Sequence, residues 1–433
     1  MLNKIKNNKF AMSTIILLIG GILTKALGFF LKIIINRNIS YKTLGLFSLL
    51  SPTNNILTIL AIMSYPTSIS KLIANKKYNS KNIILSLIPF SLLINSIIIF
   101  IIIFISSFLS NTLLKETSLK VPIICISLVL PFISFSSIIK GYFWGKQRML
   151  PYMISNILEQ ILRVVIILLL LPKTLKISVT TTICMIILVN IISESFSILI
   201  MLLFIPKIKI KLSDFIPSFN IIKDILKISI PSTTSKIVGS ICYFFEPIIL
   251  TNTLLYIGYS KNFILKEYGI LNGYALPLLL LPQFLTQSMA TALVPEIAKL
   301  NKINNKIKIK NRIILISIIS LLIGLISTII IYIYPELLLN ILFKKTEGAN
   351  YIRALAPFTL LYYLELPFIS AMQALDKAKE CMNITLISSV IKLFSIFIFS
   401  FILPGMYGLV LSIILSLIIT TYLNYRSLNK ELN

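Results

Sequence analysis

The feature that most constrains this chain is a series of apolar runs, each about as long as a bilayer is thick. The run 83–109 is an example, because Ile, Leu and Phe fill most of its positions. Lipid offers no hydrogen-bond partners to backbone amides, so such a run must satisfy them internally as an α-helix. The runs lack the period-2 alternation typical of a β-barrel. The sequence therefore predicts an all-α, polytopic transmembrane helix bundle.

Composition supports this prediction and argues against a soluble or nucleic-acid-binding protein. Only 13% of the 433 residues are charged and 57% are hydrophobic, whereas soluble domains carry roughly 25% charged residues. The net charge of +27 comes from lysines in short loops between the apolar runs, not from a basic domain. We therefore expect no nucleic-acid partner.

About twelve helices of spanning length are expected. They lie near residues 10–35, 44–66, 83–109, 121–141, 152–172, 180–205, 227–257, 268–296, 312–335, 352–374, 382–403 and 406–424. With the amino terminus inside, 25 Lys and Arg residues fall on the inner side and 11 on the outer side. The positive-inside rule then predicts a multi-pass plasma-membrane protein with both termini in the cytoplasm.

The basic stretch 207–226 is predicted to be a cytoplasmic linker between two six-helix lobes, 1–206 and 227–433. An even number of helices in each lobe lets both enter the membrane in the same sense, as in a parallel pseudo-repeat. Weak internal similarity agrees with this, because Gly45 in the second span aligns with Gly269 in the eighth at an offset of 224.

Cations inside the spans are the main candidates for substrate binding. A charge at the centre of a span costs roughly 2.5–3.5 kcal/mol on insertion scales, so it usually faces a cavity or a partner. Five such residues are Lys25, Lys32, Arg163, Lys236 and Lys392.

The first helix places Thr14, Gly21, Lys25, Gly28 and Lys32 on one face, spaced three, four or seven residues apart. A small and cationic stripe on an otherwise apolar helix predicts a hydrated wall. The alternative is that the glycines mark close helix packing and that Lys32 snorkels outward.

The seventh helix carries a comparable polar face. Its members are Ser229, Thr233, Lys236, Ser240 and Tyr243, followed by Glu246 and Pro247. Glu246 is expected either to neutralise Lys236 or Lys25 as a structural pair or to titrate in ion coupling.

Further candidates lie on three other helices. Glu159 and Arg163 form an i,i+4 pair on the fifth helix and either satisfy each other or face the cavity. Lys392 lies on the eleventh helix. Gln283 and Gln287 lie in the eighth, which is expected to bend at its prolines and line a cavity.

The motifs of common enzyme classes do not occur. The chain has no GxxxxGK[ST], GxSxG or HExxH sequence and no histidine, and its four cysteines form no CxxC pair. We expect no enzymatic activity, no cofactor and no metal site. Glu194 and Glu365, single acids in the sixth and tenth spans, receive no role from the sequence.

Four segments carry a family resemblance. They are 44–74, 138–165, 228–250 and 268–300, with the patterns GYF-G-Q-M-P-I-EQ-R and ALPLLLLP-F-TQ-ATALVP in the second and fourth. They resemble the polysaccharide biosynthesis (oligosaccharidyl-lipid flippase) family, in particular its stage V sporulation protein B subgroup. This family is part of the multidrug/oligosaccharidyl-lipid/polysaccharide (MOP) flippase superfamily.

The resemblance implies a V-shaped, MATE-like bundle of two lobes that works by alternating access. Relatives move undecaprenyl-linked sugar intermediates outward for peptidoglycan or other envelope polymers, in this subgroup for the spore cortex. Related flippases use cations in a central cavity, which Lys25, Lys32 and Lys236 would supply here. Close relatives usually have fourteen spans, so the twelve expected here lack the last pair.

Three functions follow from these observations. The first is a flippase that carries an undecaprenyl-pyrophosphate oligosaccharide or peptidoglycan precursor to the outer leaflet. The second is an ion-coupled multidrug exporter, which needs acids that the first helix lacks. The third is a scaffold that recruits envelope-synthesis enzymes through basic inner loops. The expected partners are an anionic lipid-linked glycan, membrane lipids and possible envelope-synthesis enzymes.

Overall fold

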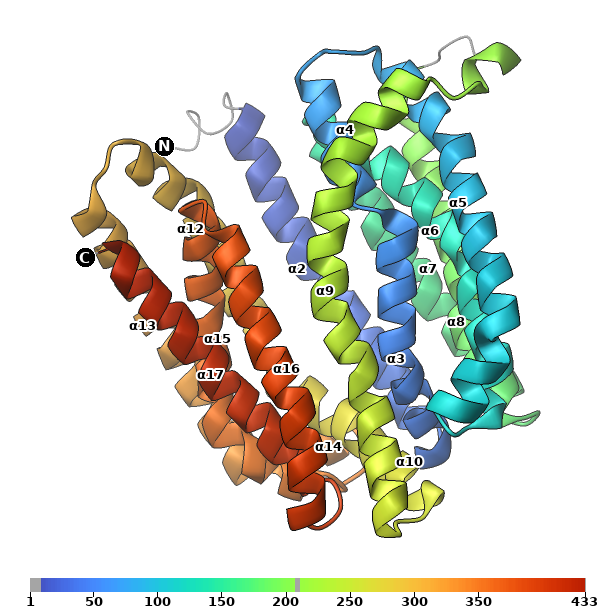
Figure 1. Cartoon of the computed structure of the whole chain (residues 1–433), viewed down its shortest axis with the longest axis vertical. Helices are drawn as coiled ribbons and strands as arrows, with labels where there is room; N and C mark the ends of the chain where they lie inside the picture. Colours follow the sequence, from blue (N-terminus) through green and yellow to red (C-terminus); the bar gives the residue numbers. More distant parts are fainter. Residues whose placement is uncertain (1–8, 207–210, 433) are drawn as a thin grey trace. The chain divides into compact units, whose positions relative to one another are not determined.

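The computed structural model describes residues 9–206 and 211–432, except for the side chains of residues 9–19, 212, 213, 288, 291, 292, 295 and 302. Its regular structure is helical (Figure 1). The helices are α2 (Lys9–Asn38), α3 (Tyr41–Ile62), α4 (Tyr65–Ala74), α5 (Ser80–Phe108), η1 (Leu109–Leu113), η2 (Thr117–Leu119), α6 (Lys120–Gly145), α7 (Met149–Thr174), α8 (Val179–Leu203), η3 (Leu212–Phe215), α9 (Phe219–Ile257), α10 (Lys261–Ile270), η4 (Leu271–Ala275), α11 (Leu276–Leu280), α12 (Gln283–Lys302), α13 (Lys306–Ile333), α14 (Pro335–Phe343), α15 (Ala349–Ala374), α16 (Ala378–Ile402) and α17 (Tyr407–Leu432).

Ten helical segments are long and apolar enough to cross a membrane, counted over the described residues. They correspond to ten of the twelve expected spans, which confirms the all-α polytopic prediction. The first expected span is the 30-residue helix α2, and the eighth is divided among α10, η4, α11 and α12. Neither is among the ten, so the count differs from the prediction by these two.

Two expected spans are broken rather than continuous. The second breaks between α3 and α4, where Met63 and Ser64 have positive φ angles of 45° and 52°. Pro66 follows in the first turn of α4, where its missing N–H leaves no helical hydrogen bond unmade. The eighth span breaks at Leu281 and Pro282, before α12. The predicted bend of the eighth span is therefore confirmed.

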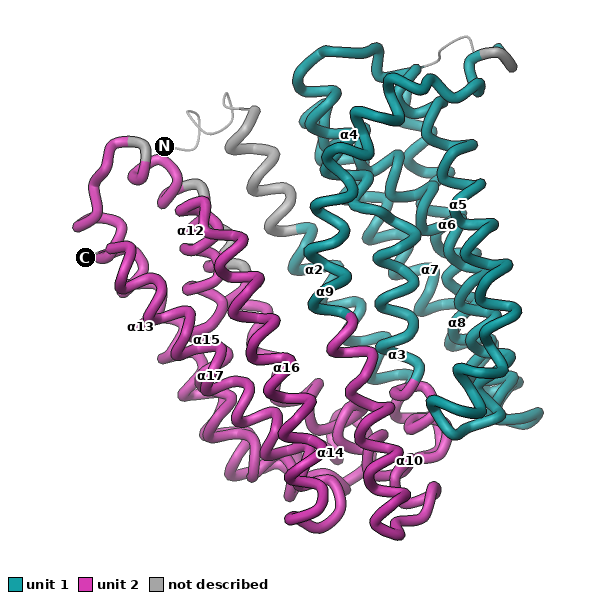
Figure 2. The backbone as a smooth tube through the Cα atoms, viewed as in Figure 1, with its two compact units in different colours: residues 1–35, 50–240 teal, residues 36–49, 241–433 magenta. Residues whose placement is uncertain are grey.

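Close contacts divide the chain into two compact units (Figure 2). Unit 1 contains residues 1–35 and 50–240, and unit 2 contains residues 36–49 and 241–433. Both α3 and α9 contribute to each unit, whereas the sequence put the division in a loop. The lobes 1–206 and 227–433, with the linker 207–226, stay a prediction.

In unit 1, two glycines let α6 pack closely on α4. A Cβ atom on Gly141 would lie 2.9 Å from the Cβ of Ile69, and one on Gly145 would lie 2.7 Å from the Cβ of Ile73. The two glycines are four residues apart and so lie on one face of α6, the small-residue spacing that brings membrane helices together. A buried apolar cluster that includes Tyr65 surrounds this contact.

In unit 2, the start of α3 packs against α10 through a second pair of glycines. A Cβ atom on Gly45 would overlap the carbonyl oxygen of Leu265, and one on Gly269 would lie 2.7 Å from the backbone nitrogen of Gly45. Only residues without side chains allow this approach. Gly45 and Gly269 are also the two positions that the internal repeat aligns.

Helices α15, α16 and α17 lie side by side in unit 2 (Figure 1). Helices α12 and α13 pack on α15 and enclose an apolar cluster with Leu293, Ile309 and Met372. Helix α15 therefore lies at the centre of this unit.

Candidate functional site

Three lysines of unit 1 have exposed side chains inside apolar helices. Lys25 and Lys32 lie on α2, and Lys236 lies on α9. No ion pair joins any of them to an acid within the described residues. Among the described side chains, these three lysines therefore have no acidic partner.

The positions of these lysines decide which can reach the membrane surface. Lys25 is 13 residues from the end of α2, and Lys236 is 17 residues from the start of α9. At about 1.5 Å per residue these distances are roughly 20 and 26 Å, far beyond the reach of a lysine side chain. Lys32 is only six residues, or about 9 Å, from the end of α2, so it can snorkel. Lys25 and Lys236 consequently need water or a ligand near the helix centre.

On the polar face predicted for the seventh helix, the hydroxyl residues make hydrogen bonds within unit 1 and the lysine does not. Ser229 shares a hydrogen bond of 2.7 Å with Ser68, and Thr233 donates to the hydroxyl of Ser64 at 3.3 Å. Lys236 lies on the same helix, but its side chain is exposed. The hydroxyls of Ser229 and Thr233 thus hold α9 against the broken span α3–α4, whereas the side chain of Lys236 takes no part in this contact.

The same contact continues towards the centre of α9. Asn55 of α3 donates to the hydroxyl of Ser240 at 3.1 Å. This hydroxyl in turn donates to the carbonyl of Lys236. The polar residues of α3 and α9 therefore hold these helices together in unit 1, in addition to any part in lining a cavity.

Unit 1 also contains a buried charge network. Arg163 donates to Glu159 at 2.8 Å and to Ser193 at 3.1–3.2 Å. The ammonium group of Lys140 lies 3.8 Å from Glu159 and 3.7 Å from Glu194. Two cations and two carboxylates from α6, α7 and α8 thus balance one another, as buried charges require.

The network contains the predicted pair Glu159 and Arg163 and one cation that was not predicted, Lys140. Glu159 and Arg163 do pair with each other, and the role of Glu194 is to complete their network with Lys140. Lys140 was not predicted as an intramembrane cation, although it lies inside the expected fourth span, 121–141. Its position one residue before the expected end of that span was the available signal, and α6 continues beyond it to Gly145. Substrate binding by Glu159 and Arg163 stays a prediction, which their mutual neutralisation does not favour.

Glu246 of unit 2 has a different partner from the one expected. Lys392 of α16 donates to its carboxylate at 2.6 Å, and the two side chains are 22% and 6% exposed for Lys392 and Glu246 respectively. Within unit 2, Glu246 is therefore neutralised by Lys392, a partner other than the expected Lys236 or Lys25. The physical reason is that the pair joins residues 146 positions apart on two different helices, a contact that helical spacing does not reveal.

Gln283 and Gln287 lie on α12 of unit 2 and are half-buried. Glu365 on α15 is also half-buried and makes no ion pair within the part of the chain that the structure describes. No described hydrogen bond joins either glutamine side chain to the cations listed above. Their place in a substrate site stays a prediction.

Comparisons with known proteins agree with this architecture. The family model "Polysaccharide biosynthesis protein" matches residues 10–301, and the MatE model matches residues 272–398. Stage V sporulation protein B of Bacillus subtilis (strain 168) is 30% identical over 98% of this chain and 84% of its own length. Sporulation protein YkvU of the same organism is 23% identical over 98% and 96%.

Two solved structures share the fold. An inward-facing multidrug resistance MATE family transporter of the MOP superfamily has a TM-score of 0.78, with 18% identity and 94% of each chain covered. A MOP superfamily transporter from Pyrococcus furiosus has a TM-score of 0.67, with 18% identity over 97% of this chain and 94% of that chain.

The helical architecture and these similarities define a multi-pass membrane protein with the fold of MOP superfamily transporters. Within it, the chain belongs to the polysaccharide biosynthesis protein family and is homologous to stage V sporulation protein B. The resemblance predicted from the sequence is confirmed.

Proposed function

We propose that this transporter is a flippase for an anionic lipid-linked glycan, of the undecaprenyl-pyrophosphate type, used for cell-envelope or spore-cortex polysaccharide. The observation that carries the proposal is the pair of exposed lysines near the centres of two apolar helices, Lys25 and Lys236, without a described counter-ion. Family membership supports a glycan-linked cargo. A pyrophosphate would supply the negative counter-charge that Lys25 and Lys236 do not have among the described residues.

The charge of the transport path favours this cargo over a cationic one. Three of the four intramembrane acids, Glu159, Glu194 and Glu246, are engaged with cations, and the fourth, Glu365 of unit 2, has no ion pair among the described residues. The exposed cations Lys25 and Lys236 have no acidic partner there. An anion that enters this environment therefore gains attraction, whereas a cation meets repulsion.

The proposed cycle is alternating access. The lysines receive the headgroup from the inner leaflet and release it on the outer side. An inside-negative membrane potential favours outward movement of an anion by about 2.3 kcal/mol per charge per 100 mV. No ATP-binding motif is needed for such a cycle, and none occurs in the sequence.

The test uses purified protein in liposomes and a fluorescent or radiolabelled undecaprenyl-pyrophosphate glycan. A hydrogen bond to a charged group contributes roughly 1.5–3 kcal/mol, so Lys25→Ala with Lys236→Ala should slow flipping at least tenfold. Lys223→Ala, an exposed lysine near the start of α9, is the matched control and should flip normally. Lys25→Arg with Lys236→Arg should retain activity. Undiminished flipping by the double alanine variant would refute the proposal.

An ion-coupled multidrug exporter is a second candidate, favoured by the MatE match over residues 272–398 and by Glu365. This carboxyl is half-buried and lacks an ion pair among the described residues, as a coupling site requires. Drug-dependent proton or sodium flux in the same liposomes, lost in Glu365→Gln, would support this function. Glycan flipping without drug-dependent flux would exclude it.

A further inference from the structure

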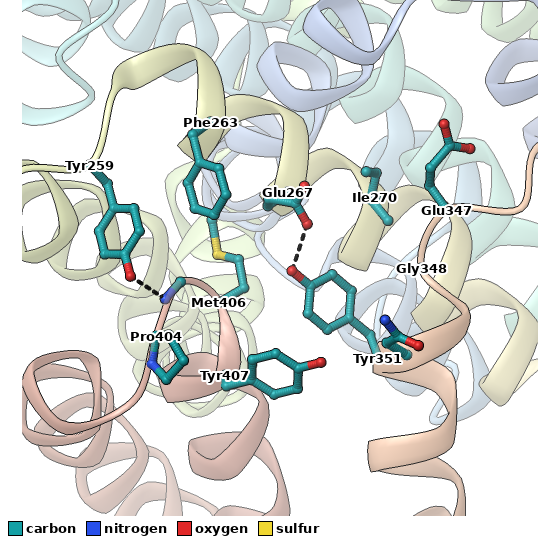
Figure 3. Close-up of a pocket in the computed structure, with 12 residues that line it drawn as sticks. Tyr259, Phe263, Glu267, Ile270, Glu347, Gly348, Tyr351, Pro404, Met406 and Tyr407 are labelled. Atoms are coloured by element: carbon teal, nitrogen blue, oxygen red, sulfur yellow. Dashed lines mark hydrogen bonds between the residues drawn. The ribbon is translucent and has the colours of Figure 1, made fainter.

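A cavity of about 520 Å³ lies within unit 2, where the loops 258–260, 344–348 and 403–406 meet (Figure 3). These loops belong to the predicted outer side of the membrane. The lining residues are Tyr259, Phe263, Glu267, Ile270, Glu347, Gly348, Asn350, Tyr351, Pro404, Gly405, Met406 and Tyr407. The volume is within the usual range for small-molecule sites.

The walls of this cavity are fixed by specific contacts. Gly405 donates its backbone N–H to the hydroxyl of Tyr259 at 2.7 Å, which ties the α16–α17 loop to the start of α10. The ring of Tyr259 stacks on that of Phe263 with centroids 5.0 Å apart. Gly348 and Gly405 have φ angles of +100° and +58°, left-handed values that glycine adopts without strain. The cavity is therefore preformed rather than a loose gap between loops.

The lining includes a carboxylate, Glu267, and an aromatic pair, Tyr351 and Tyr407. The hydroxyl of Tyr351 points to Glu267 and donates to its Oε2 at 2.6 Å (Figure 3). Tyr351 is 8% exposed, and its ring lies 5.5 Å from that of Tyr407. No ion pair to Glu267 occurs within residues 9–206 and 211–432. The hydrogen bond satisfies one oxygen and leaves the negative charge without a cation.

The rest of the lining adds negative charge and no positive charge. Hydrogen bonding from Tyr41 holds the pKa of Glu347 below its usual value, so this carboxyl is ionised at neutral pH. The lining contains no Lys or Arg. Lys266 and Lys345 lie outside the lining, with their ammonium groups over the ring of Tyr41 at 5.5 and 4.8 Å from its centroid, and the charge of Lys345 helps to lower the pKa of Glu347.

We propose that this cavity binds the ammonium group of a small organic cation. Glu267 supplies the opposite charge, and the rings of Tyr259, Tyr351 and Tyr407 supply electron-rich surfaces that attract cations. The carboxylate of Glu267 repels phosphate. This site therefore differs in its residues and in its charge from the lysines proposed to bind the anionic headgroup, and its test does not depend on flipping.

Binding is measured by calorimetry on the purified full chain in a maltoside detergent. Choline is the ammonium probe, and its uncharged isostere 3,3-dimethylbutan-1-ol is the reference. We expect saturable choline binding, at least tenfold tighter than binding of the neutral alcohol. Glu267→Gln should weaken choline binding at least tenfold and leave the alcohol unchanged. Glu336→Gln, which removes an exposed carboxylate of α14 outside the lining, should change neither.

A second variant keeps the test decisive if Glu267→Gln does not fold. Tyr407→Leu removes one ring from a residue that is 36% exposed, so we expect the fold to survive and choline binding to weaken several-fold. Absence of saturable choline binding by the wild-type chain would overturn the proposal. Equal binding of choline and the neutral alcohol would also overturn it, as would choline binding that neither variant changes.

The ammonium group has two possible sources, a dissolved ligand or a lipid headgroup. The protein is therefore also placed in nanodiscs of phosphatidylglycerol, with or without phosphatidylethanolamine. Weaker apparent choline binding in the second lipid mixture identifies the lipid as a competing ligand and supports the site. Unchanged binding supports the site with a dissolved cation as its ligand.

Discussion

Removing the carboxylate of Glu246 while keeping Lys392 tests whether this buried ion pair holds α9 to α16. In Glu246→Leu the ammonium group loses the partner that lies 2.6 Å away. Lys392 is ten residues from the end of α16, roughly 15 Å along the helix axis, so it cannot reach the surface easily. The variant therefore leaves a charge stranded in an apolar unit.

The expected loss of stability is large because the pair is buried. Removing one partner of a buried pair typically costs about 3–5 kcal/mol, whereas replacing both with apolar residues is close to neutral. We expect Glu246→Leu and Lys392→Met each to lower the free energy of unfolding by that amount. The double variant should recover most of the loss. The two effects will then be strongly non-additive.

The assay is equilibrium unfolding of the purified protein in mixed detergent micelles, with the four chains of the double-mutant cycle compared. The exposed pair Glu336 and Arg353 on α14 and α15 is the matched control, for which each single change should cost less than about 1 kcal/mol. Additive losses in Glu246→Leu and Lys392→Met, or single losses as small as the control, would refute the reasoning.

Three further predictions concern packing, pH and topology. Gly141→Ala should lower the unfolding free energy by about 1–3 kcal/mol through overpacking against α4, whereas Gly239→Ala, with open space around it, should not. Lys81 hydrogen-bonds Asp214 and lowers the pKa of this carboxyl, so the contact persists below the usual aspartate pKa and is lost as pH falls through the lowered value. Hydrogen exchange over 211–215 should rise at that point. Thr346→Cys should react with an impermeant maleimide from outside, and Asn304→Cys should not.

Each of these has a clear contrary result. Equal stability of the two glycine variants would contradict the close approach of α4 and α6. Asp214→Asn should show the faster exchange already at neutral pH, and slow exchange in that variant would contradict the role of the Lys81 contact. Labelling of Asn304→Cys but not Thr346→Cys from outside would reverse the predicted orientation.

Local patterns along the chain allowed several features to be predicted. Apolar runs gave the helices, because a helix in lipid depends mainly on the residues within it. The pair Glu159 and Arg163 was predictable for the same reason, since residues four apart meet on one helix face. The prolines of the eighth span predicted its break.

Contacts between distant segments were not predictable from spacing. Lys140 and Glu194 complete the network on α7 from two other helices, and Lys392 reaches Glu246 across 146 residues. Aligning Gly45 with Gly269 did not reveal that they touch. A periodic pattern shows which face of a helix is polar but not which helix it meets.

The sequence by itself determined that this chain is a multi-pass helical membrane protein with cations inside its spans, because hydropathy and helical spacing are properties of single segments. Only the tertiary structure decided which of those cations are neutralised. Arg163 and Lys392 have buried carboxylate partners, whereas Lys25 and Lys236 do not among the described residues. The physical reason is that the free energy of a buried charge depends on the neighbours brought to it by packing, and packing is decided by the whole fold.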